Sequence, residues 1–405
     1  MVYLAKRRRE RGAVILSVAL LLLFLLGFMG FALDFGHLFI VKTELQTAMD
    51  SCALAAAQEL DGNTDVPARA RNAGRAAGNL NRVNLQSANW SGMGNIIDAD
   101  ITFKDSAYAP TASGAAAKYA QCQHTQPNVP MWLLKAMGGF SGNAATYPAT
   151  QNVVASAVAT RASAQTACSI PVALKPKAGG VAPNYGFNVG EWVTLIQAQN
   201  AATGGEIGWA NLDGSNSASE TERELNGTCG TKVGDTLGTP GVQTSVADAW
   251  NARFGIYKNN SSPAANAPDF TGYSYTTTDW ASGRDAFNDF MSKRTVFANC
   301  GTSVSNCESV TGLRMNGGFQ TVATAGPNGE HQRYGKNRRL VAVPVVNGSN
   351  RIIDYACMLM LHPLSVPMSD AKLEFRGNAG SPGSPCTTNG IPGGTAGPLV
   401  PVLVR

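Results

Sequence analysis

AVILSVALLLLFLLGFMGFAL, residues 13–33, is an apolar run without a charged residue that directly follows a basic N-terminus. It is about 21 residues long, and ~20 residues of helix are enough to cross a ~30 Å hydrocarbon layer. The positive charges lie before the run, at Lys6, Arg7, Arg8, Arg9 and Arg11. Because basic flanks stay in the cytoplasm, the sequence predicts a cytoplasmic segment 1–12, a transmembrane helix 13–33 and an exported remainder.

A cleaved secretory signal peptide has the same order of charge and hydrophobicity. Its apolar core is usually only ~7–15 residues long and ends in small residues before the cleavage site. Here the run is longer, and Phe31 and Leu33 are interleaved with the small residues at its end. The length favours a retained anchor, and both interpretations export the residues after Asp34.

The helical pattern continues beyond the apolar run, through residues 34–61. Apolar residues recur there at steps of three and four, which is typical of a helix with a narrow apolar seam. The seam consists of Leu38, Val41, Leu45, Ala48, Cys52 and Ala55. Two interpretations remain open: the seam binds partner proteins, or it packs on the protein's own domain.

The stretch from Arg11 to Leu60 resembles the N-terminal segment of the TadE/TadG-like proteins of the Flp (tight-adherence) pilus machinery. The resemblance rests on the Arg-Gly-Ala entry at Arg11, the Asp-x-Gly at Asp34 and Gly36, and the segment Leu45–Asp50 with the alanines that follow. It covers about 50 residues. It implies a protein of the bacterial inner membrane, with a periplasmic C-terminal domain, that assists assembly or anchoring of an adhesive pilus.

One position separates this chain from the pilin-like members of that family. Those members are processed after a Gly and carry a Glu five residues later. After Gly12 the corresponding position is Ser17, so the resemblance favours the TadG branch, an accessory protein that stays anchored. It implies membrane lipid and other pilus-assembly proteins as partners, with residues 38–55 as one candidate contact surface.

The remaining sequence predicts an α+β protein in which strands dominate the exported domain. Residues 62–95 contain a second, basic-faced helix and a linker, and residues 96–377 form the exported domain. Alternating or continuous apolar patterns predict strands in this domain, for example at 153–167, 190–196, 338–346 and 351–364. Residues 378–405 read as a tail rich in Gly and Pro with a final strand.

The eight cysteines predict disulfides, because the chain is exported and has no Cys-x-x-Cys pair. The best candidate pairs are Cys300 with Cys307, Cys357 with Cys386, and Cys122 with Cys168. Cys52 lies on the helix seam, where we expect a small buried hydrophobic residue instead of a bridge.

Composition and motifs favour a structural protein over an enzyme. Charged residues make up 15% of the chain, against a usual ~25%, and the net charge of +5 gives no nucleic-acid-binding surface. The sequence contains no His-Glu-x-x-His zinc motif, no Gly-x-Ser-x-Gly elbow and no phosphate-binding loop. We therefore expect a non-enzymatic protein without a cofactor.

Two alternatives stay open. Asp213, Ser215 and Ser217 match the Asp-x-Ser-x-Ser signature of metal-dependent adhesion sites in von Willebrand A-type domains, which would make the chain a surface adhesin. The surrounding residues lack the alternating strand and helix pattern of such a domain, and the same residue types are ordinary turn formers. The other alternative is an anchored hydrolase whose site has no recognisable motif.

Overall fold

The computed structural model describes residues 11–84, 95–142, 148–196, 203–227, 229–239, 245–258, 261–315 and 318–404. The chain divides into two compact units: unit 1 is Met1–Thr160 with Pro401–Arg405, and unit 2 is Arg161–Val400. A long apolar N-terminal helix precedes strand-rich structure with several helices, so the expected α+β fold class is confirmed. The expected cytoplasmic residues Lys6, Arg7, Arg8 and Arg9 lie outside the described residues.

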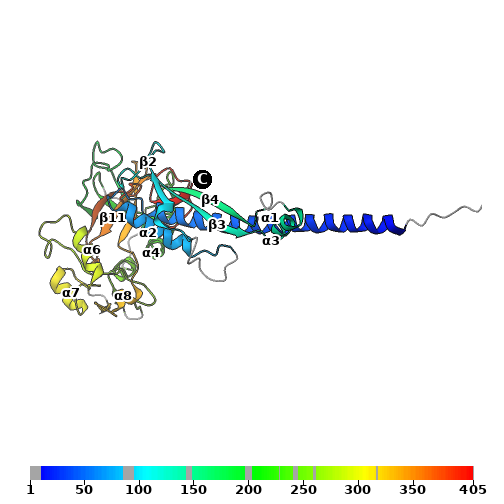
Figure 1. The fold of residues 1–405 in the computed structure, drawn as a ribbon. Coiled ribbons are helices and arrows are strands. Elements are labelled where there is room, and N and C mark those ends of the chain that lie inside the picture. Colours follow the sequence, from blue (N-terminus) through cyan, green and yellow to red (C-terminus); the bar gives the residue numbers. More distant parts are fainter. Residues whose placement is uncertain are drawn as a thin grey trace, which may run out of the picture. The chain divides into compact units, whose positions relative to one another are not determined.

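Unit 1 is built on one long helix and an antiparallel sheet (Figure 1). The sheet has the strand order β13-β4-β3-β1-β2. The elements are α1 (Arg11–Gln58), α2 (Val66–Asn79), η1 (Asp98–Asp100), β1 (Ile101–Lys104), β2 (Pro110–Thr111), β3 (Tyr119–Pro130), α3 (Trp132–Ser141), β4 (Thr150–Ser163) and β13 (Leu399–Leu403).

The C-terminal half of α1 packs closely against α2 through small residues. A Cβ added at Gly74 would lie 3.2 Å from the Cβ of Ala56, and one added at Gly78 would lie 3.1 Å from the Cβ of Cys52 and 2.3 Å from the Cδ1 of Ile96. Residues of this size let two helix backbones approach, so the Ala-rich end of α1 is the face that α2 covers.

The apolar seam of α1 is part of the core of unit 1. Val41, Leu45, Ala48 and Cys52 are fully buried, while Leu38 packs at the edge of this core and Ala55 is half-buried. Of the two interpretations left open for the 38–55 seam, binding of other envelope proteins does not fit its buried residues. Its spacing reflects the other interpretation, packing on the protein's own α2 and β3.

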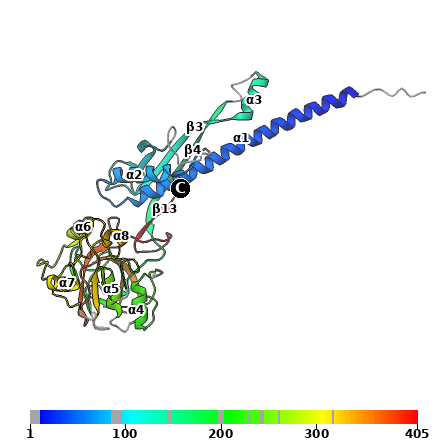
Figure 2. The same ribbon diagram turned by 90° about the horizontal axis from the view of Figure 1, so that it is seen from below.

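Strands β3 and β4 form a long hairpin that follows α1 (Figure 2). They pair antiparallel from Tyr119 opposite Thr160 to Pro130 opposite Thr150, and α3 lies at the end of the hairpin. We call the hairpin and α3 together the arm, residues 119–163. The arm contacts α1 through both β3 and α3.

The expected exported domain 96–377 is not one compact unit. Residues 96–160 pack with α1, and the division between the units falls at Thr160 and Arg161. The reason is that β1, β3 and β4 turn buried faces toward α1 and α2, as Ile101, Ala120 and Ala157 show. The sequence shows alternation within each strand but not which element a strand covers.

Unit 2 contains a closed barrel with the strand order β10-β11-β12-β6-β7-β5. Most neighbouring strands are antiparallel, but β6–β7 and β10–β5 are parallel. Its elements are β5 (Val172–Leu174), β6 (Trp192–Ile196), β7 (Ile207–Trp209), α4 (Ala218–Leu225), α5 (Ser245–Ala252), β8 (Ile256–Lys258), α6 (Phe287–Thr295), α7 (Val304–Thr311), β9 (Phe319–Val322), α8 (Glu330–Tyr334), β10 (Leu340–Val346), β11 (Ile352–Met360) and β12 (Ala371–Asn378).

A buried arginine organises the interior of unit 2. Arg339 has no exposed surface and donates hydrogen bonds to the carbonyl oxygens of Thr271, Tyr273, Met360 and Leu361. Its guanidinium also lies 4.2 Å from the centre of the Phe254 ring. Burial of a charge is costly unless its donors are satisfied, and here carbonyl oxygens satisfy them.

Four disulfides link the chain within the two units. Cys52–Cys122 joins α1 to β3 with a Cα–Cα distance of 6.1 Å, and Cys168–Cys229, Cys300–Cys307 and Cys357–Cys386 lie in unit 2. The last two are the local pairs that the sequence favoured. The expected Cys122–Cys168 pair is wrong, because Cys122 faces the buried Cys52 inside unit 1. Cys52 is buried as expected, but it is bonded.

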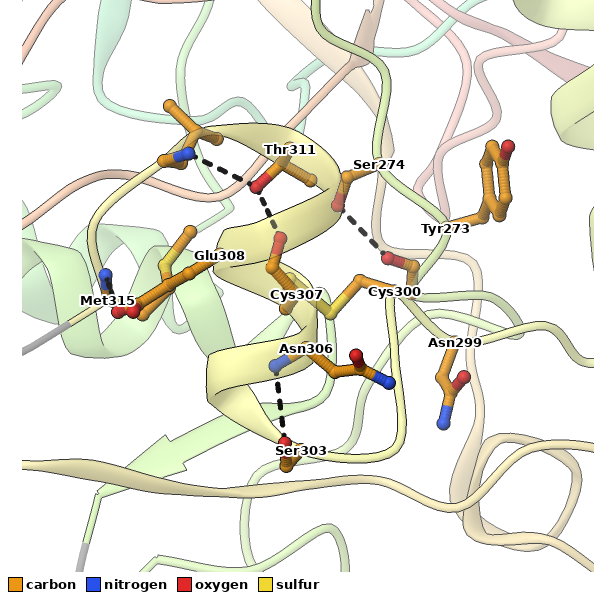
Figure 3. Close-up of a disulfide and its surroundings, with 12 residues drawn as sticks. Tyr273, Ser274, Asn299, Cys300, Ser303, Asn306, Cys307, Glu308, Thr311 and Met315 are labelled. Atoms are coloured by element: carbon orange, nitrogen blue, oxygen red, sulfur yellow. Dashed lines mark hydrogen bonds between the residues drawn. A yellow bond between two sulfur atoms is a disulfide. The ribbon is translucent and has the colours of Figure 1, made fainter. Parts of the chain in front are cut away.

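Figure 3 shows how the Cys300–Cys307 disulfide attaches α7 to the preceding loop. Ser303 precedes the helix, and its Oγ accepts a hydrogen bond from the Asn306 N–H at 3.2 Å. At the other end Thr311 Oγ1 donates to the carbonyl of Cys307 at 2.6 Å. The disulfide and the N-cap therefore fix the same short helix.

The small-residue contact between α1 and α2 predicts that Gly78→Val destabilises unit 1. Overpacking of a filled core costs about 1–3 kcal/mol, and the valine methyls would meet Ile96 and Cys52. The control is Ala76→Val on the exposed side of the same helix. A lowered melting temperature in detergent for Gly78→Val but not for Ala76→Val is expected, and equal effects would contradict this packing.

The stability of unit 2 is expected to decrease as the pH falls from about 6.5 to about 4. Burial lowers the pKa of His362 from 6.5 to about 4, while its Nδ1 donates to the Pro363 carbonyl and its Nε2 accepts from the Lys372 N–H. In this window the unfolded chain binds a proton that the folded chain does not, so acid favours unfolding. At ~1.4 kcal/mol per pKa unit, His362 accounts for about 3 kcal/mol.

This dependence is measured by urea unfolding at pH 7 and pH 4, followed by tryptophan fluorescence. His362→Gln removes the titrating group, so the decrease in unfolding free energy should be smaller by roughly the His362 contribution of about 3 kcal/mol. An unchanged decrease in this variant would contradict the assignment to His362.

Candidate functional site

The N-terminal part of α1 exposes an apolar surface that no other described residue covers. An 18-residue window of this helix has a mean hydropathy of 2.8 and is 6% buried, so by length and composition it can cross a membrane. The large apolar side chains from Val14 to Leu33 are all exposed, for example Phe24 and Leu33. Exposed apolar area of this extent indicates an apolar environment or a partner.

Asp34, the first charged residue after the apolar run, is fully buried. Its Oδ1 accepts a hydrogen bond from the Trp132 N–H at 3.0 Å, and its Oδ2 accepts from Leu133 and Leu134 at 2.9 and 2.6 Å. These are the first three amides of α3, which lack partners within the helix. Asp34 thus provides from α1 the cap that Met131, the residue before α3, does not provide.

The carboxylate also suits the electrostatics of this helix end. The N-terminus of a helix carries a partial positive charge, and an anion placed there is stabilised. Hydrogen bonds to an ionised acceptor are stronger than neutral ones. A buried carboxylate would otherwise be costly, so the three amides and the helix dipole explain how Asp34 is stabilised in its buried position.

Gly30 and His37 lie on the same face of α1 as Asp34 and complete the contact with α3. A Cβ added at Gly30 would lie 2.9 Å from the Cβ of Leu133, so a glycine is needed for the close approach. The His37 ring stacks on the Trp132 ring with centroids 4.6 Å apart. Spacings of four and three residues place these groups on successive turns.

We call Gly30, Asp34, His37 and the first turn of α3 the docking site of the arm. The sequence shows Asp34 at the end of the apolar run, but it does not indicate the contact of Asp34 with the start of α3. The spacing of Gly30, Asp34 and His37 was the available signal on α1. Its partner lies about a hundred residues further along the chain, which the sequence pattern does not indicate.

The side chains of Asp213, Ser215 and Ser217, the motif left open as an alternative metal-adhesion site, each bond a different group. Asp213 Oδ1 accepts from the Ser215 N–H, whereas Ser215 Oγ accepts from Asn211 Nδ2 and Ser217 Oγ bonds Ser219 Oγ. The three residues lie in a turn that follows β7, and β7 is a strand of the closed barrel.

The carboxylates that approach Asp213 are instead those of Glu220 and Glu224, with oxygens within 4.8 Å of one another. Glu224 accepts from the N–H groups of Leu212 and Asp213, and burial raises its pKa. These bonds fasten the turn to α4.

The histidines of the described residues have structural surroundings. His331 is fully buried, its Nδ1 bonds the Asp269 carbonyl at 2.7 Å, and burial lowers its pKa. His124 is on β3, with its Nδ1 2.8 Å from Asp100 Oδ2, so it fixes β3 to the turn before β1. His362 accepts from a backbone amide of β12, as described above.

The apolar span and the docking site lie in a segment with recognisable relatives. Residues 12–59 match a family model described as putative Flp pilus-assembly TadE/G-like. This confirms, over that segment, the resemblance seen in the sequence. No curated protein and no solved structure matches the chain. We refer to residues 12–59 as the TadE/G-like segment.

The docking site therefore combines residues from inside the TadE/G-like segment with residues from outside it. Gly30, Asp34 and His37 belong to the TadE/G-like segment, while α3 belongs to the part outside it. Gly36, the other residue of the Asp-x-Gly pair, has no heavy atom within 4 Å of an added Cβ. Within this pair, Asp34 is the residue that makes the contact.

We predict that Asp34→Ala releases the first turn of α3. A hydrogen bond to a charged group is worth about 1.5–3 kcal/mol, and ~1.4 kcal/mol is a factor of ten in an equilibrium. The amides of Trp132, Leu133 and Leu134 should therefore exchange with deuterium about tenfold faster or more. The measurement is hydrogen exchange of the full chain in detergent or nanodiscs.

Asp105→Ala is the matched control, because Asp105 also accepts two backbone N–H groups, from Ala107 and Ala109, in the turn between β1 and β2. This variant should leave exchange in α3 unchanged. Unchanged exchange in Asp34→Ala would show that the carboxylate does not hold α3.

Proposed function

We propose that this chain is a non-enzymatic protein of the bacterial inner membrane that assists assembly or anchoring of Flp-type pili. Its N-terminus is cytoplasmic and its C-terminal units are periplasmic. The observation that carries the proposal is the TadE/G-like match over residues 12–59, on a helix whose apolar half is exposed. The basic residues before the run support the orientation.

The disulfides support an exported location for the remainder of the chain. All eight cysteines are paired in the structure. Disulfides form and persist in the periplasm and are rare in the cytosol. The first of them, Cys52–Cys122, lies only about 18 residues beyond Asp34, so the oxidising side begins close to the end of the apolar run.

The buried charges of unit 2 support a structural role. Asp269, fully buried, accepts from the N–H groups of Arg338 and Arg339, and Glu374, also fully buried, accepts from the N–H of Ala286 and bonds Arg376. Each of these groups fastens one segment of backbone to another. We infer that unit 2 is a scaffold, whose partners are other pilus-assembly proteins.

Partner proteins are expected to bind outside the seam of α1. Four of the seam residues, Val41, Leu45, Ala48 and Cys52, are fully buried in the core of unit 1, so these four are not available. The exposed face of α1 and the surface of unit 2 remain for lipid and for other proteins of the machinery.

Deletion of the chain in its source bacterium tests the proposal. We expect fewer surface pili by electron microscopy and weaker adhesion to a surface, with both restored by the wild-type chain. A strain without the chain that makes normal numbers of pili and adheres normally would overturn the proposed function.

A second complementation tests the anchor separately. Replacing residues 1–33 by a cleaved signal peptide would export the same units without the span. If the anchor matters, this version accumulates in the periplasm but does not restore pili. If this version restored pili fully, the chain would still have a role in piliation, but the membrane helix would not be needed for that role.

A further inference from the structure

The apolar surface of the chain does not end with the apolar run at residue 33. On α1, Phe39 is 69% exposed and Ile40 is 47% exposed, one to two turns beyond Asp34. On α3, Trp132 is 57% exposed and Leu133 is also exposed. An apolar surface therefore continues from the predicted span onto the start of the arm.

The docking site fixes the level of α3 relative to the predicted span. The first amides of α3 bond Asp34, and Leu133 packs on Gly30, inside the run. If residues 13–33 cross the ~30 Å hydrocarbon layer, Gly30 lies within it and Asp34 at its edge. The start of α3 is then held at the boundary between hydrocarbon and headgroups.

The chemistry of α3 suits that boundary. Trp is enriched where a membrane meets water, because its ring is apolar and its N–H is polar. Unpaired N–H groups are costly near hydrocarbon, and Asp34 satisfies those of the first turn. Lys135, three residues after Trp132 on α3, is exposed, and a long cationic side chain at the edge of the hydrocarbon can reach the headgroup region.

A cavity of about 490 Å³ adjoins α3 on the side of β4. Apolar side chains line most of it, among them Phe35, Phe39, Met131, Leu134 and Val153. Lys42 also lines it and donates a hydrogen bond to the Val154 carbonyl. On α1 the cavity extends from Phe35 to Lys42, up to about 12 Å beyond Asp34, so it leads from the edge of the hydrocarbon into the headgroup region. Its apolar lining with a cation at the far end matches an acyl chain with its headgroup.

We propose that α3 and the adjoining cavity form a second membrane contact, which lies in the periplasmic leaflet and takes lipid acyl chains as its ligand. The proposal rests on the membrane anchoring proposed above. Lipid is the occupant because the same continuous surface already faces lipid along α1. Two contacts, one spanning and one interfacial, fix the rotation of α1 about its axis and the direction of the arm.

Trp132 fluorescence in lipid vesicles tests the contact. The full chain is reconstituted in phosphatidylcholine and phosphatidylglycerol vesicles, with ordinary or brominated acyl chains, and its insertion is checked by resistance to alkaline carbonate. The emission of Trp132 is obtained by subtracting the fluorescence of the Trp132→Phe variant from that of the wild type. This substitution keeps an aromatic ring beside His37. Trp280→Phe in unit 2 is the matched control.

We expect brominated lipid to remove most of the Trp132 emission, while acrylamide in the water has little effect on it. The emission lost in Trp280→Phe should show no quenching by brominated lipid. A Trp132 emission that acrylamide quenches and brominated lipid does not would overturn the proposal and leave this surface to water or to a protein partner.

The outcomes separate this proposal from the others. Release of the chain by alkaline carbonate would refute both the anchor and the lipid contact. Quenching of Trp132 by brominated lipid, together with normal pili in the deletion strain, would uphold the contact and refute the pilus function.

Discussion

Helix α1 has one half that exposes apolar side chains and one half that packs in the core of unit 1. The packing of the other elements of unit 1 depends on which faces of α1 are buried. The N-terminal half of α1 exposes apolar side chains on nearly every side, while its C-terminal half buries one face of small and apolar residues. Between the halves, Asp34 ends the exposed apolar part and begins the folded part. A charge that would be unfavourable on its own is stabilised there by the first turn of α3.

The sequence predicted this helix well because length, charge and periodicity are local signals. The helix over the apolar run, its continuation to Gln58, three residues short of the predicted end at 61, and the strand-rich character of the remainder all appear in the structure. The family resemblance over the N-terminal segment was readable from the same residues. Each of these features depends on residues close together in the chain.

The features that the sequence did not predict depend on pairing between distant segments. Cys52 and Cys122 are 70 residues apart, and periodicity alone gave no reason to join them. The same applies to Asp34 and Trp132, whose contact explains both the buried carboxylate and the position of an apolar helix at the tip of a hairpin. Arg339 shows the limit in another way, because a run of basic residues usually indicates a solvated surface, yet this side chain is fully buried in unit 2.

The Asp34 contact also orders events in time. The residues it holds are 98 to 100 positions further along the chain. At ~5–20 residues per second, about 5 to 20 seconds of synthesis separate the two. The helix that carries Asp34 is therefore complete before its cap ligands exist, and Cys52 likewise waits for Cys122. Under the proposed topology, closure of the arm on α1 marks the point at which the chain from Asp34 to Leu134 has been exported.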